Sequence, residues 1–266
     1  MTTATVAGSP PPPVVVVTGG ASGLGQATVH RLVGVGFAAV VLDRDGRRAA
    51  DVHRALGDAV RVVEGDATDP DVVRRAVAVA GDLGVLRVVV ACAGGSVTRG
   101  VVDAAGAAHP LDDFDGLAAV NLRATFDVLR QGAAAMVAGS PPVDGERGLV
   151  VMTGSIAALE GRAGMAAYAA TKAAVLALVL PAARDLAPFG IRVLAVAPGA
   201  FDTPMLAAGR QGTPPSTSAT EVPFPSRLGR PDEFAALVQH AWENKYLNGT
   251  TLRLDGGLRL RSGLSG

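Results

Sequence analysis

Val14-Val15-Val16-Val17-Thr18-Gly19-Gly20-Ala21-Ser22-Gly23-Leu24-Gly25 is the stretch that decides the fold. Its four valines predict a short strand, and its glycines predict a tight turn into a helix over about residues 25–35. Such glycines let the backbone approach a pyrophosphate, which the free amides at the start of a helix can hold. The spacing is G-x-x-x-G-x-G rather than the commoner G-x-G-x-x-G, and many glycine-rich turns are only turns. Because a strand precedes this turn and a helix follows it, we favour a dinucleotide site.

Asp43 follows a second apolar run, residues 37–42, and lies about 20 positions beyond the glycines. A carboxylate at that place accepts hydrogen bonds from the adenosine ribose hydroxyls. It would also repel a 2′-phosphate, so the sequence favours NAD over NADP. Arg44 leaves an alternative open, because an arginine there could accept that phosphate or could simply be a solvated loop charge.

Tyr168 and Lys172 lie four residues apart, so one helical turn places the phenol and the ammonium on the same face. A neighbouring cation favours the phenolate, which would bring the tyrosine pKa from near 10 toward the working range of an acid–base catalyst. The spacing is common by chance, but the chain has only two lysines, Lys172 and Lys245. Ser155, thirteen residues upstream of the tyrosine, follows an expected strand, at the sheet edge where open α/β sheets bind ligands.

Strand-like and helix-like patterns alternate through the chain, as in βαβ units around a parallel sheet. We therefore expect an α/β fold, a Rossmann-type doubly wound parallel sheet of about seven strands, in a single domain over residues 14–266. The strands are expected at 14–17, 37–42, 59–65, 85–91, 148–153, 191–197 and 251–254. Two long helices are expected, one over 114–137 with Asn121 and one over 166–186. Pro181 should kink the second helix or reshape its hydrogen bonding there.

Composition fits one soluble domain of 266 residues, with 49% hydrophobic and only 4% aromatic residues. The formal net charge is zero, from 24 basic and 24 acidic residues, so we expect neither nucleic acid nor membrane as a partner. One cysteine, Cys92, excludes an internal disulfide and fits a reducing compartment. Four scattered histidines and the lack of a Cys-x-x-Cys pair give no metal-ligand spacing.

The first thirteen residues are small and polar and end in four prolines, so we expect a flexible leader over 1–13. They lack the positive start and apolar stretch of a secretory signal. No apolar run reaches the roughly 18 residues needed to cross a bilayer without a polar or helix-breaking interruption. These observations predict a cytoplasmic protein.

With these residues in view, the chain resembles the short-chain dehydrogenase/reductase family over almost its whole length. The matching elements stand in the family's order: Thr18 to Gly25, Asp66 after the third strand, Cys92-Ala93-Gly94 after the fourth, Asn121, Ser155, Tyr168 with Lys172, and Pro198-Gly199.

The resemblance implies a site for each step of a hydride transfer. Ser155 and Tyr168 would bind the substrate hydroxyl, Tyr168 would take its proton, and Lys172 would stabilise the phenolate. Asn121 would hold a helix irregularity and a water that links Lys172 to solvent. Asn121, Ser155, Tyr168 and Lys172 would thus be catalytic. NAD would be bound by Thr18, Gly19, Ser22, Gly23, Leu24, Gly25, Asp43, Asp66, Ala67, Cys92, Ala93, Gly94, Tyr168, Lys172, Pro198, Gly199 and Thr203.

Several stretches are similar to one branch of that family, 3-hydroxyacyl-CoA dehydrogenase type II, which is also described as a hydroxysteroid dehydrogenase. They are residues 111–114, 183–188, 222–229 and 247–249, with an insertion between Gly95 and Leu111 and Cys92 where most of the family has asparagine. This similarity implies a 3-hydroxyacyl-CoA substrate, as in fatty-acid or branched-chain amino-acid breakdown. It also implies a homotetramer that uses the long helices and the C-terminal strand as interfaces.

Arg162 and Met165 depart from that branch, which is more similar to glutamine at both positions. They could shift the preferred acyl length or move the activity to a steroid or another secondary alcohol. Arg162 could instead pair with Glu160 or a surface carboxylate. A non-catalytic scaffold of the same fold is a third alternative, against which the intact Asn121, Ser155, Tyr168 and Lys172 argue.

The segment 200–227 is rich in Pro, Ser, Thr and Gly, and loops of that length are usually lids, binding loops or disordered. The family resemblance favours a substrate lid with Thr203 near the nicotinamide carboxamide, and a plain mobile loop is the alternative. Leu206, Val222 and Phe224 are the apolar residues expected to cover an acyl group.

Overall fold

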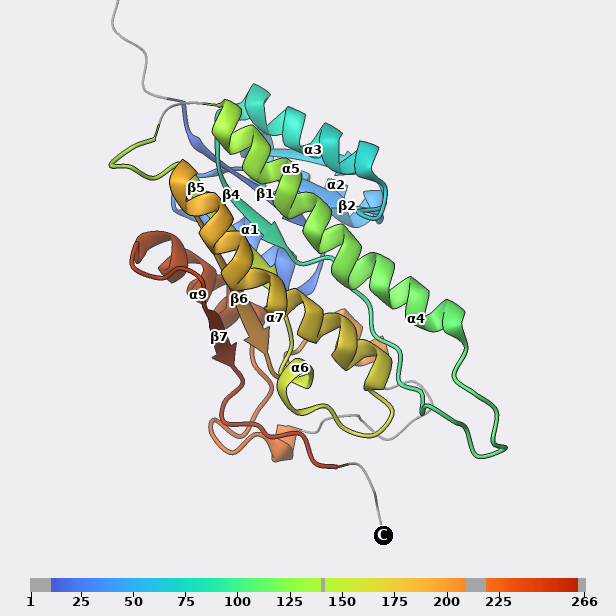
Figure 1. The fold of residues 1–266 in the computed structure, drawn as a ribbon. Helices are drawn as coiled ribbons and strands as arrows, with labels where there is room; N and C mark the ends of the chain where they lie inside the picture. The colour runs from blue at the N-terminus through green and yellow to red at the C-terminus, as the bar shows by residue number, and fades with distance from the viewer. Residues whose placement is uncertain (1–10, 140–141, 209–218, 263–266) are drawn as a thin grey trace, which may run out of the picture.

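Seven parallel strands form one sheet between two layers of helices in the computed structural model, which describes residues 11–139, 142–208 and 219–262 (Figure 1). The strand order is β3-β2-β1-β4-β5-β6-β7. The strands are β1 (Pro13–Thr18), β2 (Ala38–Asp43), β3 (Val60–Glu64), β4 (Val85–Ala91), β5 (Gly148–Thr153), β6 (Ile191–Pro198) and β7 (Thr251–Leu254). The predicted α/β class and strand number are confirmed.

The valines of β1 explain why both faces of the sheet are covered. Val14 and Val16 pack in one core cluster, whereas Val15 and Val17 pack in the other, because successive side chains point to opposite faces of a strand. Helices α3 (Pro70–Leu83), α5 (Ala124–Ala138) and α7 (Ala166–Leu186) cover the first face, in the foreground of Figure 1. Helices α1 (Gly23–Gly34), α2 (Gly46–Leu56) and α9 (Pro231–Glu243) cover the second.

Short helices complete the chain, mostly at the carboxyl edge of the sheet. These are α4 (Leu111–Leu117), α6 (Ala157–Glu160), α8 (Pro204–Ala208), the 3₁₀ turns η1 (Gly57–Ala59), η3 (Ala187–Phe189) and η4 (Ala219–Glu221), and the π-helical turn η2 (Ala118–Arg123). The chain reverses its direction of winding between β1 and β4. In open α/β sheets, such a switch point opens a ligand crevice at the carboxyl ends of the strands.

Some element bounds differ from the prediction. The helix expected over 114–137 begins at Leu111 and is interrupted by η2. The leader is shorter than expected, because Pro13 opens β1 and the Pro12 carbonyl accepts from the Val85 amide at 3.0 Å. Residues 1–10 of that leader lie outside the described residues.

Helix α7 is the most apolar long element. With the turn that follows it, Ala166–Phe189, it is long and apolar enough by length and composition alone to cross a membrane. In this fold the helix packs on β6 and continues through Pro181, yet only 28% of its most apolar window is buried. One side of α7 therefore presents apolar surface outside the domain.

Candidate active site

The glycine turn brings together three segments that are distant in sequence. Gly19 and Gly23 adopt positive φ of 66° and 51°, a region that L side chains rarely occupy. A Cβ on Gly19 would lie 2.9 Å from the Ala93 nitrogen, and one on Gly23 would lie 3.2 Å from the Thr203 methyl carbon. The turn thus lies against the segment after β4 and the start of the long loop. Ser22 and Leu24 flank the start of α1, which begins two residues earlier than expected.

Asp43 is fixed beside this turn at the end of β2. Its Oδ2 accepts from the Ala21 amide and its Oδ1 from the Asp45 amide, both at 3.0 Å. Each carboxylate oxygen can accept a further hydrogen bond, so the group is placed to receive hydroxyls at the end of a dinucleotide that lies on the turn.

Asp66 and Ala67 follow β3, next along the same edge. The Thr68 amide donates to Asp66 Oδ1 at 2.8 Å, and this bond, with a smaller contribution from the nearby Arg44, holds the pKa of Asp66 below its usual value. Ala67 is buried in the core. Arg44 itself is exposed and interacts with the Asp66 carboxylate, so both of its predicted roles stay open.

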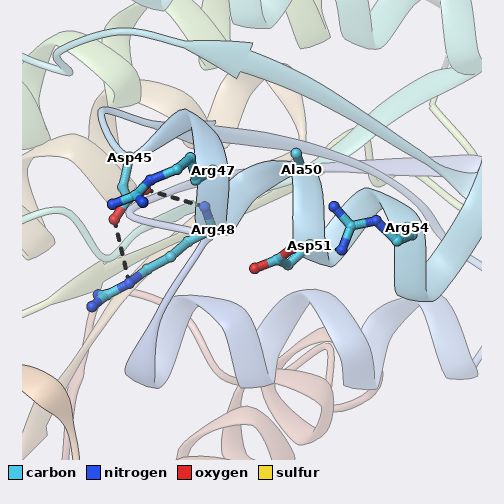
Figure 2. A pocket seen from close by; sticks show the side chains of 6 residues that line it. All are labelled: Asp45, Arg47, Arg48, Ala50, Asp51 and Arg54. Atoms are coloured by element: carbon cyan, nitrogen blue, oxygen red, sulfur yellow. Dashed lines mark hydrogen bonds and ion pairs between the residues drawn. The ribbon is translucent and has the colours of Figure 1, made fainter.

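A shallow hollow of about 430 Å³ lies on the outer side of α2 (Figure 2). Asp45 pairs with Arg48 at 3.3 Å and Asp51 with Arg54 at 2.8 Å. Two of the arginines that line the hollow are therefore neutralised by carboxylates of the same segment. Helix α2 covers the opposite face of the sheet from α7. The hollow is therefore not the reacting centre.

The segment after β4 is held by β1 and β5. The Cys92 and Ala93 amides donate to the Thr18 carbonyl and hydroxyl oxygens, both at 3.2 Å. The Thr153 hydroxyl donates to Cys92 Sγ at 3.5 Å. Burial raises the pKa of the Cys92 thiol to about 11, so the thiol is neutral and unreactive near pH 7.

Asn121 lies in the π-helical turn η2 and is fully buried. Its side-chain amide exchanges two hydrogen bonds with the Gly95 backbone, at 2.9 and 3.0 Å, and Nδ2 also donates to the Thr171 hydroxyl at 3.1 Å. The Thr171 hydroxyl in turn donates to the Tyr168 carbonyl at 2.8 Å. The helix irregularity expected at Asn121 is present, whereas the expected water stays a prediction.

Thr171 is a residue that the sequence reasoning missed. It is buried within the Tyr168–Lys172 motif and connects the π turn to the helix that carries the tyrosine. The sequence did contain a signal for it, because Thr171 is a hydroxyl residue among the apolar residues of this helix.

Ser155 and Tyr168 meet at the carboxyl end of β5. Ser155 Oγ accepts from the Ala157 amide at 3.1 Å, and Ser155 also hydrogen bonds with the phenol. Burial raises the pKa of Tyr168, and the hydrogen bond from Ser155 opposes this rise only in part. The expectation that Lys172 brings this pKa down is therefore wrong for these side-chain positions.

Lys172 is buried on the same helix, and its Nζ donates to the Thr153 carbonyl at 2.8 Å. A Cβ on Gly94 would lie 2.8 Å from Asn121 Oδ1 and 3.5 Å from Lys172 Nζ, so the amide and the amine both lie close to Gly94. Burial lowers the pKa of Lys172 to about 8. An amine with this pKa can change its charge at mildly alkaline pH.

Pro198 ends β6 beside Ser155, and Gly199 follows it. The Pro198 carbonyl accepts from the Ile156 amide at 3.1 Å, and the Gly199 amide donates to the Leu254 carbonyl at 2.9 Å. The structure thus brings all four predicted catalytic residues to the carboxyl edge of the sheet, next to the glycine turn.

The apolar residues expected to cover an acyl group have different surroundings. Val222 is buried against Gly256, Leu206 is half-buried, and Phe224 is 82% exposed. The part of this loop over 209–218 lies outside the described residues. Arg162 does not form the ion pair with Glu160 that the sequence left open, because Glu160 pairs with Arg253 and Arg259 instead.

Comparisons with known proteins agree with this geometry. The short chain dehydrogenase family matches residues 13–213. The human 3-hydroxyacyl-CoA dehydrogenase type-2 is 44% identical over 91% of this chain and 94% of its own length. The ipsdienol dehydrogenase of Ips pini is 32% identical over 91% of this chain and 94% of its own. The crystal structure of 3-hydroxyacyl-CoA dehydrogenase type-2 from Mycobacterium avium superposes with a TM-score of 0.87 at 39% identity, covering 94% of this chain and 97% of that one.

A nicotinamide cofactor and a small-molecule substrate follow from this family. The glycine turn, the Ser155–Tyr168 contact and the buried Lys172 on the next turn of α7 are the parts that such an enzyme needs. By its sequence, its fold and the relatives that cover nearly its whole length, the chain belongs to the short-chain dehydrogenase family and is an oxidoreductase that interconverts a secondary alcohol and a ketone.

Proposed function

We propose that the protein is an NAD-dependent 3-hydroxyacyl-CoA dehydrogenase. The observation that carries the proposal is the meeting of Ser155 and Tyr168 beside the glycine turn, in a chain 44% identical to a relative of that name. The proposed partners are an acyl-CoA substrate and other copies of the chain, in the cytoplasm.

Each side chain has one task in this reaction. Ser155 donates to or accepts from the substrate oxygen and so orients the carbinol carbon. Tyr168, as the phenolate, takes the hydroxyl proton as a general base and becomes the neutral phenol. The positive charge of Lys172 would favour the phenolate before this transfer, when its ammonium lies near the phenol oxygen. A nicotinamide cofactor held at the glycine turn would supply the acceptor for the hydride that leaves the carbinol carbon. Asn121 and Thr171 hold the first turn of α7 in place for these steps.

The preference for NAD rests on Asp43. Its carboxylate is fixed by two backbone amides at the end of β2, where it would accept the ribose hydroxyls and repel a 2′-phosphate. Arg44 is exposed beside it and supports the alternative.

Oxidation of NADH with acetoacetyl-CoA, compared with a panel of steroids and simple ketones, tests the proposal. We expect kcat/KM to be highest for the acyl-CoA and higher with NADH than with NADPH. Tyr168→Phe keeps the ring and removes the exchangeable proton, so we expect turnover to fall about 1000-fold. Wild-type turnover in that variant would contradict the mechanism.

A second candidate is a dehydrogenase of a hydroxysteroid or another secondary alcohol. It is favoured by Arg162 and Met165 in the loop before α7 and by the relative named ipsdienol dehydrogenase. In the same assay, a steroid or simple ketone would then give the highest kcat/KM.

A further inference from the structure

The C-terminal segment 255–262 contacts two loops on the side of the molecule where the substrate is expected to bind. It follows β7, and its Leu258 side chain is anchored in the interior with 1% exposure. The Ala163 amide, in the loop before α7, donates to the Ser262 carbonyl at 3.0 Å. The Phe224 amide, at the end of the long loop, donates to the Gly256 carbonyl at 3.3 Å. One short segment therefore connects these two loops.

Four charged residues fix this segment to the catalytic side of the sheet. Arg253 of β7 forms ion pairs with Glu160, the last residue of α6, and with Asp255. Arg259 pairs with Asp255 at 3.2 Å and with Glu160 at 3.7 Å. Arg253 also donates to the Leu258 carbonyl at 2.8 Å. We call Glu160, Arg253, Asp255 and Arg259 the edge network; its two cations and two anions balance.

The edge network is less exposed than an ordinary surface pair. The Arg253 and Glu160 side chains are about a quarter exposed, and that of Asp255 is 8% exposed. Partly desolvated ion pairs interact more strongly than exposed ones, and the arginine fork can contact two carboxylates at once. Removing one member would leave a partly buried charge without its partner.

Glu160 directly precedes the loop 161–165, whose other end opens the helix that carries Tyr168. On its far side, the Gly164 carbonyl of this loop accepts from the Arg99 amide at 2.8 Å. The loop, with half-buried Arg162 and Met165, is thus held between the edge network and the segment after β4. The glycine turn and Asp43 belong instead to β1, α1 and β2, on the other half of the sheet.

We propose that the edge network is a positioning device for the substrate: it fixes the loop 161–165 relative to the segment 222–224, so that substrate affinity depends on it much more than cofactor affinity does. This inference rests on the proposed function for the identity of the substrate. The positioning itself is a property of the two loops and can be observed without turnover.

The test compares Arg253→Met, Arg253→Lys, Glu160→Gln and the double variant Glu160→Gln/Arg253→Met with wild type. We expect Arg253→Met to raise KM for acetoacetyl-CoA about tenfold while KM for NADH changes less than about twofold. Arg253→Lys keeps the charge but loses the two-pronged guanidinium, so its KM for acetoacetyl-CoA should lie between those of wild type and Arg253→Met. The double variant should raise KM for acetoacetyl-CoA by less than the product of the two single effects, because each single change already removes the Glu160–Arg253 pair.

Hydrogen exchange of the Ala163 and Phe224 amides supplies a readout besides activity. Both should exchange faster in Arg253→Met, and neither should in the control Arg54→Met, whose pair with Asp51 on α2 is exposed. Arg259→Ala, at the exposed end of the network, gives a milder variant if Arg253→Met does not fold. Light scattering checks that each variant keeps the wild-type mass.

An unchanged KM for the acyl substrate, an equal rise in both KM values, or unaltered exchange at both amides overturns the inference. If wild type does not turn over acetoacetyl-CoA, the proposed function falls. The exchange experiment still decides on the positioning in that case.

Discussion

Lys172 links the site to the pH dependence of stability. It is buried with its ammonium on the Thr153 carbonyl, and burial lowers its pKa from 10.5 to about 8. Between these two values the unfolded chain binds more protons than the folded one. The contribution of this residue to the free energy of unfolding therefore rises with pH across that window, and below it the buried charge costs about 3 kcal/mol.

Lys172→Met should reveal that cost. The quantity of interest is the free energy of unfolding of the variant minus that of wild type. We expect this difference to favour the variant most at pH 7 and to fall by about 2 kcal/mol by pH 10. Urea unfolding of both proteins at each pH from 7 to 10 measures the difference. Methionine also leaves the Thr153 carbonyl without its donor, but that effect is the same at each pH. A difference that does not vary with pH would contradict the assigned shift.

At the scale of elements, strand limits could be predicted because local signals end each strand. The strands expected at 85–91, 148–153 and 251–254 and the helix at 166–186 have those limits in the structure. The runs 148–153 and 251–254 are followed by Gly154 and Asp255, and parallel strands buried on both faces read as continuous apolar runs.

The π turn and the tyrosine environment could not be predicted in the same way. The turn at Asn121 coincides with hydrogen bonds to Gly95, 26 residues away, which the local pattern over 114–137 does not contain. The pKa of Tyr168 is raised by burial, which depends on the assembled fold rather than on the spacing to Lys172. The spacing predicted that Tyr168 and Lys172 share one helix, but it could not give the burial that shifts their pKa values.

Helix α1 offers a matched pair of glycines to test the turn. A Cβ on Gly25 would lie 2.2 Å from the Gly19 carbonyl oxygen, whereas one on Gly34 would meet nothing within 4 Å. Gly25→Ala must therefore displace the turn, and we expect NADH to bind at least about tenfold more weakly, with a loss of about 1–3 kcal/mol in stability. Gly34→Ala should bind NADH normally and gain up to about 1 kcal/mol from helix propensity.

Isothermal titration with NADH and urea unfolding measure the two effects. Normal NADH affinity in Gly25→Ala would show that the close packing of helix and turn is not needed to hold the dinucleotide.

At the scale of the whole molecule, two surfaces remain suited to other copies of the chain. Phe126 of α5 and Leu180 of α7 are 47% and 45% exposed on the same layer of helices (Figure 1). Strand β7 ends the sheet, and its outer edge carries backbone groups that can pair with another chain. Two different self-complementary surfaces generate a closed tetramer, since each alone forms only a dimer.

We therefore expect light scattering to give about four times the chain mass of 26.7 kDa. Phe126→Glu places a charge in the helix surface, so it should reduce the mass to that of a dimer that the other surface still holds. Val35→Glu, half-exposed after α1 on the opposite layer, should remain tetrameric. A wild-type mass of one chain would exclude both surfaces as interfaces, and a tetrameric Phe126→Glu would exclude the helix surface. Loss of the tetramer in Val35→Glu would instead move an interface to the α1 side of the sheet.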